Sequence, residues 1–462
     1  MTAPGRGWHS PGAGRASHVD AGVEFQGTTV QLAGLFPFVA GSGAPMLGVP
    51  IGRHLLWGET CCLDPLEWLR AGLVTNPGMF LLGQPGAGKS ALAKRLITGM
   101  AGFGTRVLIL GDTKPDYTLL VHRLGGQVIR VGRGLDRINP LDAGPLGAAL
   151  GRLPQREAER LRLEVRGRRL ALLLALATLV RGGRITNTEE VLLGRSVDLL
   201  DARLDRQPTI PDVLGVLRAG PDEVRLGADH DRQAADLVAT LTLLCDGSLR
   251  GVLDGPTSTP IDLDAPAVSV DISQTAAAGD QLVAIAMLCT WAYTFAVVDA
   301  AAALAACGLV PRRQFFGVMD ELWRALRGAP GLVDHADALT RLSRPLGMGT
   351  LMITHSLDDL DALPTDEDRA KARGFFERAA IKILAALPGR ELDRVGAVVR
   401  LSAAERSLVS SWAAPDALVP GRAHPGRGRY LIKTGEGPGL PVGMRLVGDE
   451  PTIYDTDTAV RL

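Results

Sequence analysis

One stretch of the chain has the residue types and spacing of a phosphate-binding loop. It is Gly83-Gln84-Pro85-Gly86-Ala87-Gly88-Lys89-Ser90, which fits the pattern G-x-x-x-x-G-K-[ST]. An apolar run, Met79–Leu82, precedes it, and helical spacing follows from Ala91 to Ile97. A strand, a loop and a helix in this order point successive backbone N–H groups and a helix N-terminus at an anion. A chance match among the chain's 56 glycines is disfavoured, because both flanks fit as well.

The residue types of this loop predict particular roles around ATP and Mg²⁺. Lys89 is expected to reach the β- and γ-phosphates, and Ser90 is expected to bind Mg²⁺. The predicted nucleotide contacts are Gly83, Gln84, Pro85, Gly86, Ala87, Gly88, Lys89, Ser90 and Ala91.

An acidic pair, Asp320-Glu321, follows a second apolar run at Gln314–Met319. In ATPases with such a loop, an aspartate at a strand end supports Mg²⁺ and a polar residue orients the attacking water. Acidic pairs after apolar runs are common, so this prediction depends on the phosphate loop upstream in the same domain. We expect Asp320 to bind Mg²⁺ together with Ser90, and Glu321 to position the water.

Polar residues also follow two other predicted strands. Asp112 and Lys114 follow one of them, and they are expected to shape the site because ligands gather at the carboxyl ends of parallel strands. Thr354-His355 ends another strand. If that strand neighbours the one before the phosphate loop, His355 would sense the γ-phosphate. The alternative is that the pair only starts the helix at 356–360.

Composition limits the classes of protein that the chain can belong to. The 462 residues are 46% hydrophobic and 22% charged, which suits a chain with a sizeable core. The formal net charge is zero, which argues against a strongly basic coat for nucleic acid, although a local basic patch or pore is compatible with it. The five cysteines show neither zinc-site spacing nor a disulfide framework, so a reducing cytoplasm is the simplest setting.

Alternating strands and helices predict an α/β fold with a mainly parallel sheet and helices on both faces. Between two such blocks lie four long helical stretches without strand-like runs. The predicted divisions are a disordered tail (1–20), a short β-rich lead-in (21–75), a core in two pieces (76–143 and 260–446), an inserted all-helical subdomain (144–255) and a C-terminal tail (447–462).

One apolar run, Ala284–Ala306, is long enough to cross a bilayer. It contains Trp291, Tyr293 and Asp299, and a charge within lipid is costly. It also lies between two predicted strands of one sheet. We therefore expect a buried helix. The first 20 residues lack the apolar core of a secretory signal.

The order and spacing of these motifs resemble one family of proteins. Five segments carry most of the resemblance: Asp112–Tyr117 (D-P-K-x-[ED]-Y), Leu124–Arg130 (L-G-G-x-x-I-R), Ile138–Asp142 (I-N-P-L-D), Asp320–Trp323 (D-E-x-W) and Thr354–Leu360 (T-Q-S-x-x-D-L). Ala404-Glu405-Arg406 and Gly428-Arg429 fit its C-terminal part. The chain is thus similar, from about Gly48 to Leu446, to the traffic ATPases of type IV secretion and conjugation systems. These belong to the VirB-four/TraC type of the RecA-like HerA/FtsK superfamily. His355 stands where the family usually has glutamine.

The resemblance implies a RecA-like P-loop NTPase core that hydrolyses ATP with Mg²⁺ and drives secretion or conjugative DNA transfer. It also implies a ring, a homo-hexamer, with active sites between subunits. In such rings a neighbour's arginine neutralises transition-state charge. The candidates here are Arg341, Arg344 and Arg429.

The partners implied by the resemblance are further copies of the chain, membrane channel proteins of the secretion or conjugation system, and DNA. The setting is the cytoplasm, at the inner face of the cell membrane. Only about 80 residues precede the phosphate loop, fewer than the large N-terminal docking domain of the family needs. One alternative is therefore a soluble DNA-translocating ATPase of the HerA/FtsK/coupling-protein type. Another is a nucleotide-dependent switch or scaffold without turnover, which the Asp320-Glu321 pair disfavours.

Overall fold

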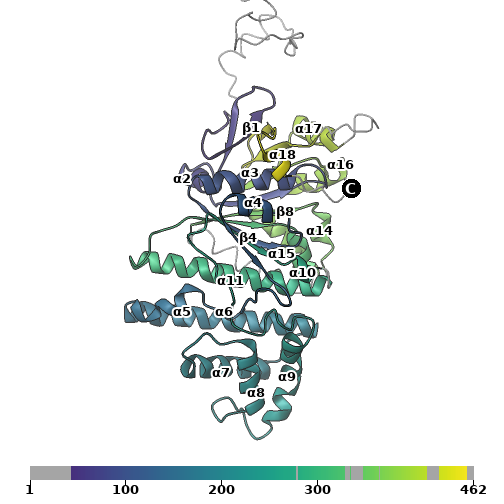
Figure 1. Ribbon diagram of the computed structural model, residues 1–462. Helices are drawn as coiled ribbons and strands as arrows, with labels where there is room; N and C mark the ends of the chain where they lie inside the picture. The colour runs from purple at the N-terminus through teal and green to yellow at the C-terminus, as the bar shows by residue number, and fades with distance from the viewer. Residues whose placement is uncertain are drawn as a thin grey trace, which may run out of the picture. The chain divides into compact units, whose positions relative to one another are not determined.

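A mixed sheet of eleven strands runs through the described part of the chain (Figure 1). The computed structural model describes residues 43–276, 279–327, 333, 347–363, 365–413 and 426–454. The strand order is β2-β1-β11-β10-β9-β3-β8-β7-β4-β6-β5.

Seven neighbouring strands of this sheet are parallel. They are β9 (Ile381–Leu384), β3 (Gly78–Leu82), β8 (Met348–Thr354), β7 (Phe315–Met319), β4 (Arg106–Asp112), β6 (Ala267–Asp271) and β5 (Gln127–Arg130). All residues of β6, β7 and β8 are buried, as expected for parallel strands covered on both faces. The predicted α/β class with a mainly parallel sheet is confirmed.

Four strands continue the sheet beyond β9 in antiparallel pairing. They are β10 (Arg429–Lys433), β11 (Leu440–Gly443), β1 (Val49–His54) and β2 (Thr60–Leu63). The strands expected in the lead-in at 21–75 therefore belong to the same sheet as the phosphate loop and form no separate layer. Residues 21–42 of that lead-in, and the predicted tail at 1–20, lie outside the described residues.

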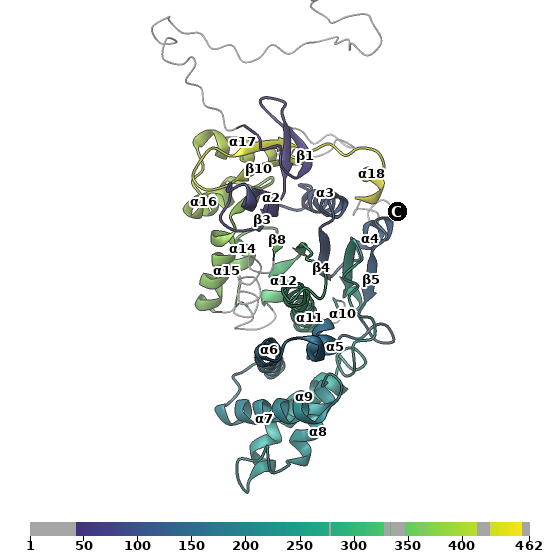
Figure 2. The same ribbon diagram turned by 90° about the vertical axis from the view of Figure 1, so that its left-hand side faces the viewer.

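Helices pack on both faces of the parallel strands. On one face lies α3 (Lys89–Gly102), and on the other lies α11 (Asp280–Ala306) (Figures 1 and 2). The indole N–H of Trp291 on α11 donates to the Leu110 carbonyl of β4 at 2.9 Å. The remaining helices beside the sheet are α2 (Pro65–Arg70), α4 (Thr118–Arg123), α10 (Ser273–Ala276), α12 (Leu322–Arg327), α14 (Asp358–Asp361), α15 (Asp366–Arg378), α16 (Gly389–Val398), α17 (Ala403–Ala413) and α18 (Glu450–Ile453).

Among the described helices, α11 alone is long and apolar enough to cross a membrane. In its most apolar 18-residue window, 83% of the residues are buried inside the protein. Its carboxylate Asp299 pairs with Arg168 of a neighbouring helix. This arrangement agrees with the prediction of a buried core helix.

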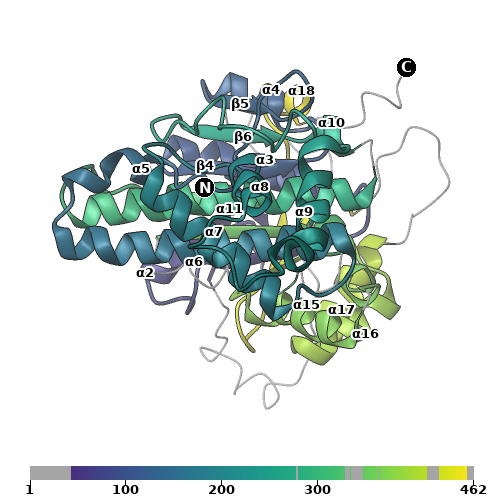
Figure 3. The same ribbon diagram turned by 90° about the horizontal axis from the view of Figure 1, so that it is seen from below.

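Residues 144–255 form helices and loops without a strand. Seen from below, the longest of these helices, α6, lies lengthwise along α11 (Figure 3). Buried apolar residues continue from the sheet through α11 into this block, so it shares the core of the sheet. The block contains α5 (Pro145–Ala149), a 3₁₀ turn (Leu150–Arg152), α6 (Gln155–Arg181), α7 (Asn187–Arg203), α8 (Ile210–Ala219) and α9 (His230–Asp246).

Candidate active site

The phosphate loop connects the end of β3 to the start of α3. Two of its glycines, Gly86 and Gly88, have φ values of 80° and 95°, a left-handed conformation that side chains disfavour. A Cβ atom added to Gly88 would lie 2.9 Å from the hydroxyl oxygen of Tyr430. That hydroxyl donates to the Gly88 carbonyl at 2.7 Å, and the N–H of Gly428 donates to the Ala87 carbonyl at 3.1 Å. The hairpin of β10 and β11, with the turn before it, thus supports the phosphate loop through Tyr430 and Gly428.

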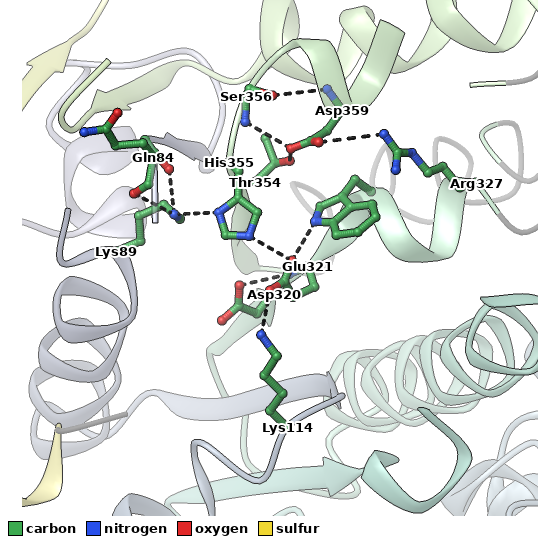
Figure 4. Close-up of polar contacts among 12 residues, drawn as sticks. Gln84, Lys89, Lys114, Asp320, Glu321, Arg327, Thr354, His355, Ser356 and Asp359 are labelled. Carbon is green, nitrogen blue, oxygen red and sulfur yellow. Dashed lines mark hydrogen bonds and ion pairs between the residues drawn. The ribbon is translucent and has the colours of Figure 1, made fainter. Parts of the chain in front are cut away.

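Lys89 lies folded back over the loop (Figure 4). Its ammonium group donates to the carbonyls of Gly83 at 2.6 Å and Gln84 at 3.2 Å. It also lies 2.8 Å from Nδ1 of His355. Burial lowers the pKa of Lys89 to about 8, although nearby carboxylates oppose this. Three acceptors therefore hold the ammonium group of Lys89 beside the phosphate loop.

One of the two neighbours of β3 is β8, with Leu82 opposite Thr354. The strand that ends at Thr354 therefore lies beside the strand that precedes the phosphate loop, as a γ-phosphate sensor at His355 requires. The imidazole of His355 lies between Lys89 and Glu321 (Figure 4). A lysine ammonium can only donate, so Nδ1 of His355 accepts and its proton is on Nε2. Nε2 lies 3.4 Å from Oε2 of Glu321.

The acidic pair begins where β7 ends. Both carboxylate oxygens of Asp320 have donors: one accepts from the Tyr117 hydroxyl at 2.6 Å, and the other accepts from the Glu321 N–H at 2.9 Å. Burial raises the pKa of Asp320. Burial alone would also raise the pKa of Glu321. The donors His355 and Trp323 and the charge of Lys114 outweigh it and lower that pKa to about 2, so Glu321 is a carboxylate at neutral pH.

Further carboxylates lie at the neighbouring strand end of β4. Oδ2 of Asp112 accepts from the N–H of Tyr117 at 3.0 Å. Burial and the nearby charges of Asp116, Asp271 and Asp320 raise the pKa of Asp112 to about 8. Burial also raises the pKa of Asp116. A cation bound here would relieve this concentration of acidic groups.

The donor set suits Mg²⁺. The Ser90 hydroxyl and the Asp320 carboxylate line the same cavity, and both are hard oxygen ligands. The described residues contain no group of three or more His, Cys, Asp or Glu side chains arranged to hold a metal ion. Mg²⁺ usually keeps several water ligands and is bound by one or two protein carboxylates together with phosphate.

The loop and these strand ends enclose a cavity of about 270 Å³. Gly83, Gln84 and Ala87 do not line it; the carbonyls of Gly83 and Gln84 hold Lys89, and that of Ala87 holds the loop to Gly428. The predicted residues that line the cavity are Pro85, Gly86, Gly88, Lys89, Ser90, Ala91, Asp112, Lys114, Asp320, Glu321 and His355.

Four lining residues were not predicted: Thr113, Asp116, Arg427 and Tyr454. Thr113 and Asp116 lie within the quoted motif Asp112–Tyr117, so that motif was the available signal. Of the three candidate arginines, Arg429 is exposed at the start of β10 and does not line the cavity. Arg341 and Arg344 lie outside the described residues.

The described start of the predicted C-terminal tail, residues 447–454, contacts the phosphate-loop helix α3. Arg95 of α3 pairs with Glu450 of α18, and the hydroxyls of Thr98 and Tyr454 lie 3.0 Å apart. The guanidinium of Arg95 also donates to the Arg445 carbonyl at 2.8 Å. The segment up to Tyr454 is therefore fastened along the phosphate-loop helix.

The fold and the site together define the class: an α/β protein with a RecA-like P-loop core. No family model matches the sequence, and no curated protein does either. Among solved structures, VirB4 of Thermoanaerobacter pseudethanolicus is 20% identical, with a TM-score of 0.67 over 89% of this chain and 100% of that chain. Two structures of the plasmid coupling protein TrwB are also similar.

The TrwB complex with the non-hydrolysable GTP analogue GDPNP is 12% identical, with a TM-score of 0.51 over 88% of this chain and 97% of that chain. The complex with the ATP analogue ADPNP is 13% identical, with a TM-score of 0.50 over 88% of this chain and 96% of that chain. At these identities the likeness establishes the fold. The resemblance indicated by the motifs is thereby confirmed at the level of the fold.

Proposed function

We propose that this protein is the ATP-hydrolysing motor of a type IV secretion or conjugative DNA-transfer machinery. The observation that carries the proposal is the convergence of Lys89, Ser90, Asp320 and Glu321 on one cavity at the carboxyl ends of β3, β4 and β7. The likeness to VirB4 over that chain's whole length, and the motif resemblance, support the assignment to this machinery.

In the proposed reaction, the loop N–H groups and Lys89 bind the phosphates of ATP. Ser90 and Asp320 hold Mg²⁺, which supplies positive charge to the phosphate oxygens. Glu321, ionised at neutral pH, orients the attacking water. Asp112 and Lys114 shape the site from the end of β4.

His355 has the contacts that a γ-phosphate sensor needs. It joins Lys89 on one side to Glu321 on the other. When Lys89 exchanges its present acceptors for phosphate oxygens, Nδ1 of His355 loses its donor, and the imidazole becomes free to reorient. Glutamine, the usual residue of the resembling family, also presents an acceptor group and a donor group, so His355 keeps one group of each kind.

We further propose that the chain works as a ring, a homo-hexamer, in the cytoplasm at the inner face of the membrane. Its partners are membrane channel proteins and DNA. Arg429 is exposed and thus accessible to a neighbouring subunit, while Arg341 and Arg344 are the other candidates for a transferred arginine.

The first experiment is an ATPase assay with Mg²⁺ on the full chain. Lys89→Ala and Glu321→Gln should each abolish turnover. Matched controls are Lys371→Ala and Glu223→Gln, which remove surface charges on α15 and after α8 and should leave turnover unchanged. Wild-type turnover in both site variants would overturn the proposal.

The similarity to TrwB, a plasmid coupling protein, keeps a DNA-translocating ATPase as the second candidate. Stimulation of turnover by DNA favours that candidate. Absence of stimulation, together with co-purification of membrane channel subunits, favours the secretion motor. ATP binding without turnover in the wild type would instead identify a switch or scaffold.

A further inference from the structure

Glu321 has an unusual backbone conformation. Its φ is 52°, and no other non-glycine residue in the described parts of the chain has a positive φ. A residue with a side chain adopts this region rarely, so the surroundings must hold it there. Two backbone contacts contribute: the N–H of Glu321 donates to Asp320, and its carbonyl accepts from the N–H of Arg324 at 2.9 Å.

The side chain of Glu321 is held at one oxygen by Trp323. The indole N–H donates to Oε2 at 2.6 Å, a short and therefore strong contact with a charged acceptor. His355 approaches the same oxygen at 3.4 Å. The other oxygen, Oε1, lies 3.5 Å from the ammonium nitrogen of Lys114. The two carboxylate oxygens of Glu321 are therefore not equivalent.

The indole of Trp323 is itself fixed from the other side. The guanidinium of Arg327 lies 4.7 Å from the ring centroid, within the range of a cation–π contact. The same guanidinium lies 3.8 Å from a carboxylate oxygen of Asp359. Asp359 accepts from the Ser356 N–H at 3.1 Å and from the Thr354 hydroxyl at 3.3 Å (Figure 4). Through Arg327 and Asp359, Trp323 is therefore connected to the segment that carries His355.

We propose that Trp323 is a positioning residue for ATP hydrolysis: its indole N–H anchors Oε2 of Glu321 and leaves Oε1 to bind the attacking water. Arg327 and Asp359 hold the indole at a fixed distance from the strand end that bears His355. This inference rests on the proposed function and deepens it, because it names the oxygen that binds the attacking water.

A packing role for Trp323 makes a different prediction. If the ring served only to fill space, phenylalanine would replace it with little loss, since the stack with Arg327 and the apolar contacts would persist. Loss of the N–H alone frees the carboxylate to rotate. A displacement of about 1 Å at a catalytic group can cost on the order of a hundredfold in rate.

The test is the steady-state kinetics of Trp323→Phe in the full chain. The expected result is a fall in kcat of about ten- to a hundredfold with KM for ATP within about twofold of wild type. The control is Trp68→Phe, which removes an indole N–H bond to the Leu47 carbonyl, remote from the cavity, and should leave kcat unchanged. A wild-type kcat in Trp323→Phe, or a raised KM with unchanged kcat, overturns the inference.

A second variant covers the case in which Trp323→Phe does not fold. Arg327→Gln removes the group that stacks on the indole from a half-buried position, and should lower kcat by a smaller factor at unchanged KM. An unchanged kcat in Arg327→Gln contradicts the chain of contacts. The two proposals fail differently: a wild-type protein without turnover overturns the proposed function and this role with it, whereas an active wild type with an equally active Trp323→Phe overturns this role alone.

Discussion

A buried ion pair inside the helical block gives a stability prediction that can be worked through. Glu189 is 3% exposed. Its carboxylate accepts two bonds from Arg181, at 2.6 and 2.9 Å, and caps the start of α7 by accepting from the N–H and hydroxyl of Thr186. Burial alone would raise the pKa of Glu189, but these donors outweigh it and lower the pKa from 4.5 to about 2.

The pKa of Glu189 is 4.5 in the unfolded chain and about 2 in the folded protein. This difference corresponds to about 3 kcal/mol of stability at neutral pH. The folded pKa lies below the unfolded one, so this contribution is complete above pH 4.5 and is lost as the pH falls toward about 2. At pH 3.5 the same two values leave about 2 kcal/mol. Glu189→Gln keeps the shape and one acceptor oxygen but removes the charge. We expect it to lower the free energy of unfolding by about 2–3 kcal/mol at pH 7 and by about 1 kcal/mol less at pH 3.5.

The assay is urea unfolding followed by circular dichroism at both pH values, with the free energy extrapolated linearly to water. The control is Glu223→Gln, whose partner is Arg203. Both of these side chains are more than half exposed, so the loss should stay below about 0.5 kcal/mol. The reasoning is refuted if Glu189→Gln costs no more than this control at pH 7, or if its cost does not shrink at the lower pH.

Two further variants test the support of the phosphate loop. Tyr430→Phe removes the hydroxyl that donates to the Gly88 carbonyl, and should lower the free energy of unfolding by about 1 kcal/mol and raise KM for ATP several-fold. Steady-state kinetics at varied ATP would contradict this by showing an unchanged KM. Glu450→Gln weakens the pairing with Arg95 that fastens α18, and should cost about 2 kcal/mol in urea unfolding. An unchanged midpoint would show that Tyr454 is held at the cavity by other contacts.

The local motifs of the site could be predicted because their chemistry depends on residues close together in sequence. The turn at Gly86 and Gly88, the lysine that follows, and the acidic pair after β7 all have such patterns. The sequence alone could not place His355 beside the phosphate loop, because that position depends on which strand lies beside β3. That neighbour comes from more than 260 residues further along the chain, and periodicity within one strand carries no information on its partner.

The end of the chain shows where sequence reasoning fails. The four-residue helix α18 is too short to show a helical period, so residues 447–454 read as a tail. Their position depends on pairing between Arg95 and Glu450, and no spacing rule links residues so far apart. Tyr454 and Arg427 also line the cavity with residues that are far from them in sequence, so no local pattern predicts their position. The sequence also did not show that β1 and β2 extend the central sheet, because β1 pairs with β11, which lies almost 400 residues further along the chain.

The contact between Gly88 and Tyr430 also has a consequence for synthesis of the protein on the ribosome. A chain grows from its N-terminus, and domains generally fold as their sequence emerges. Here the phosphate-loop strand emerges more than 260 residues before its partner β8, and before β9, Tyr430 and Tyr454. A nascent chain therefore lacks some contacts of the phosphate loop and its cavity until Tyr454 has left the exit tunnel.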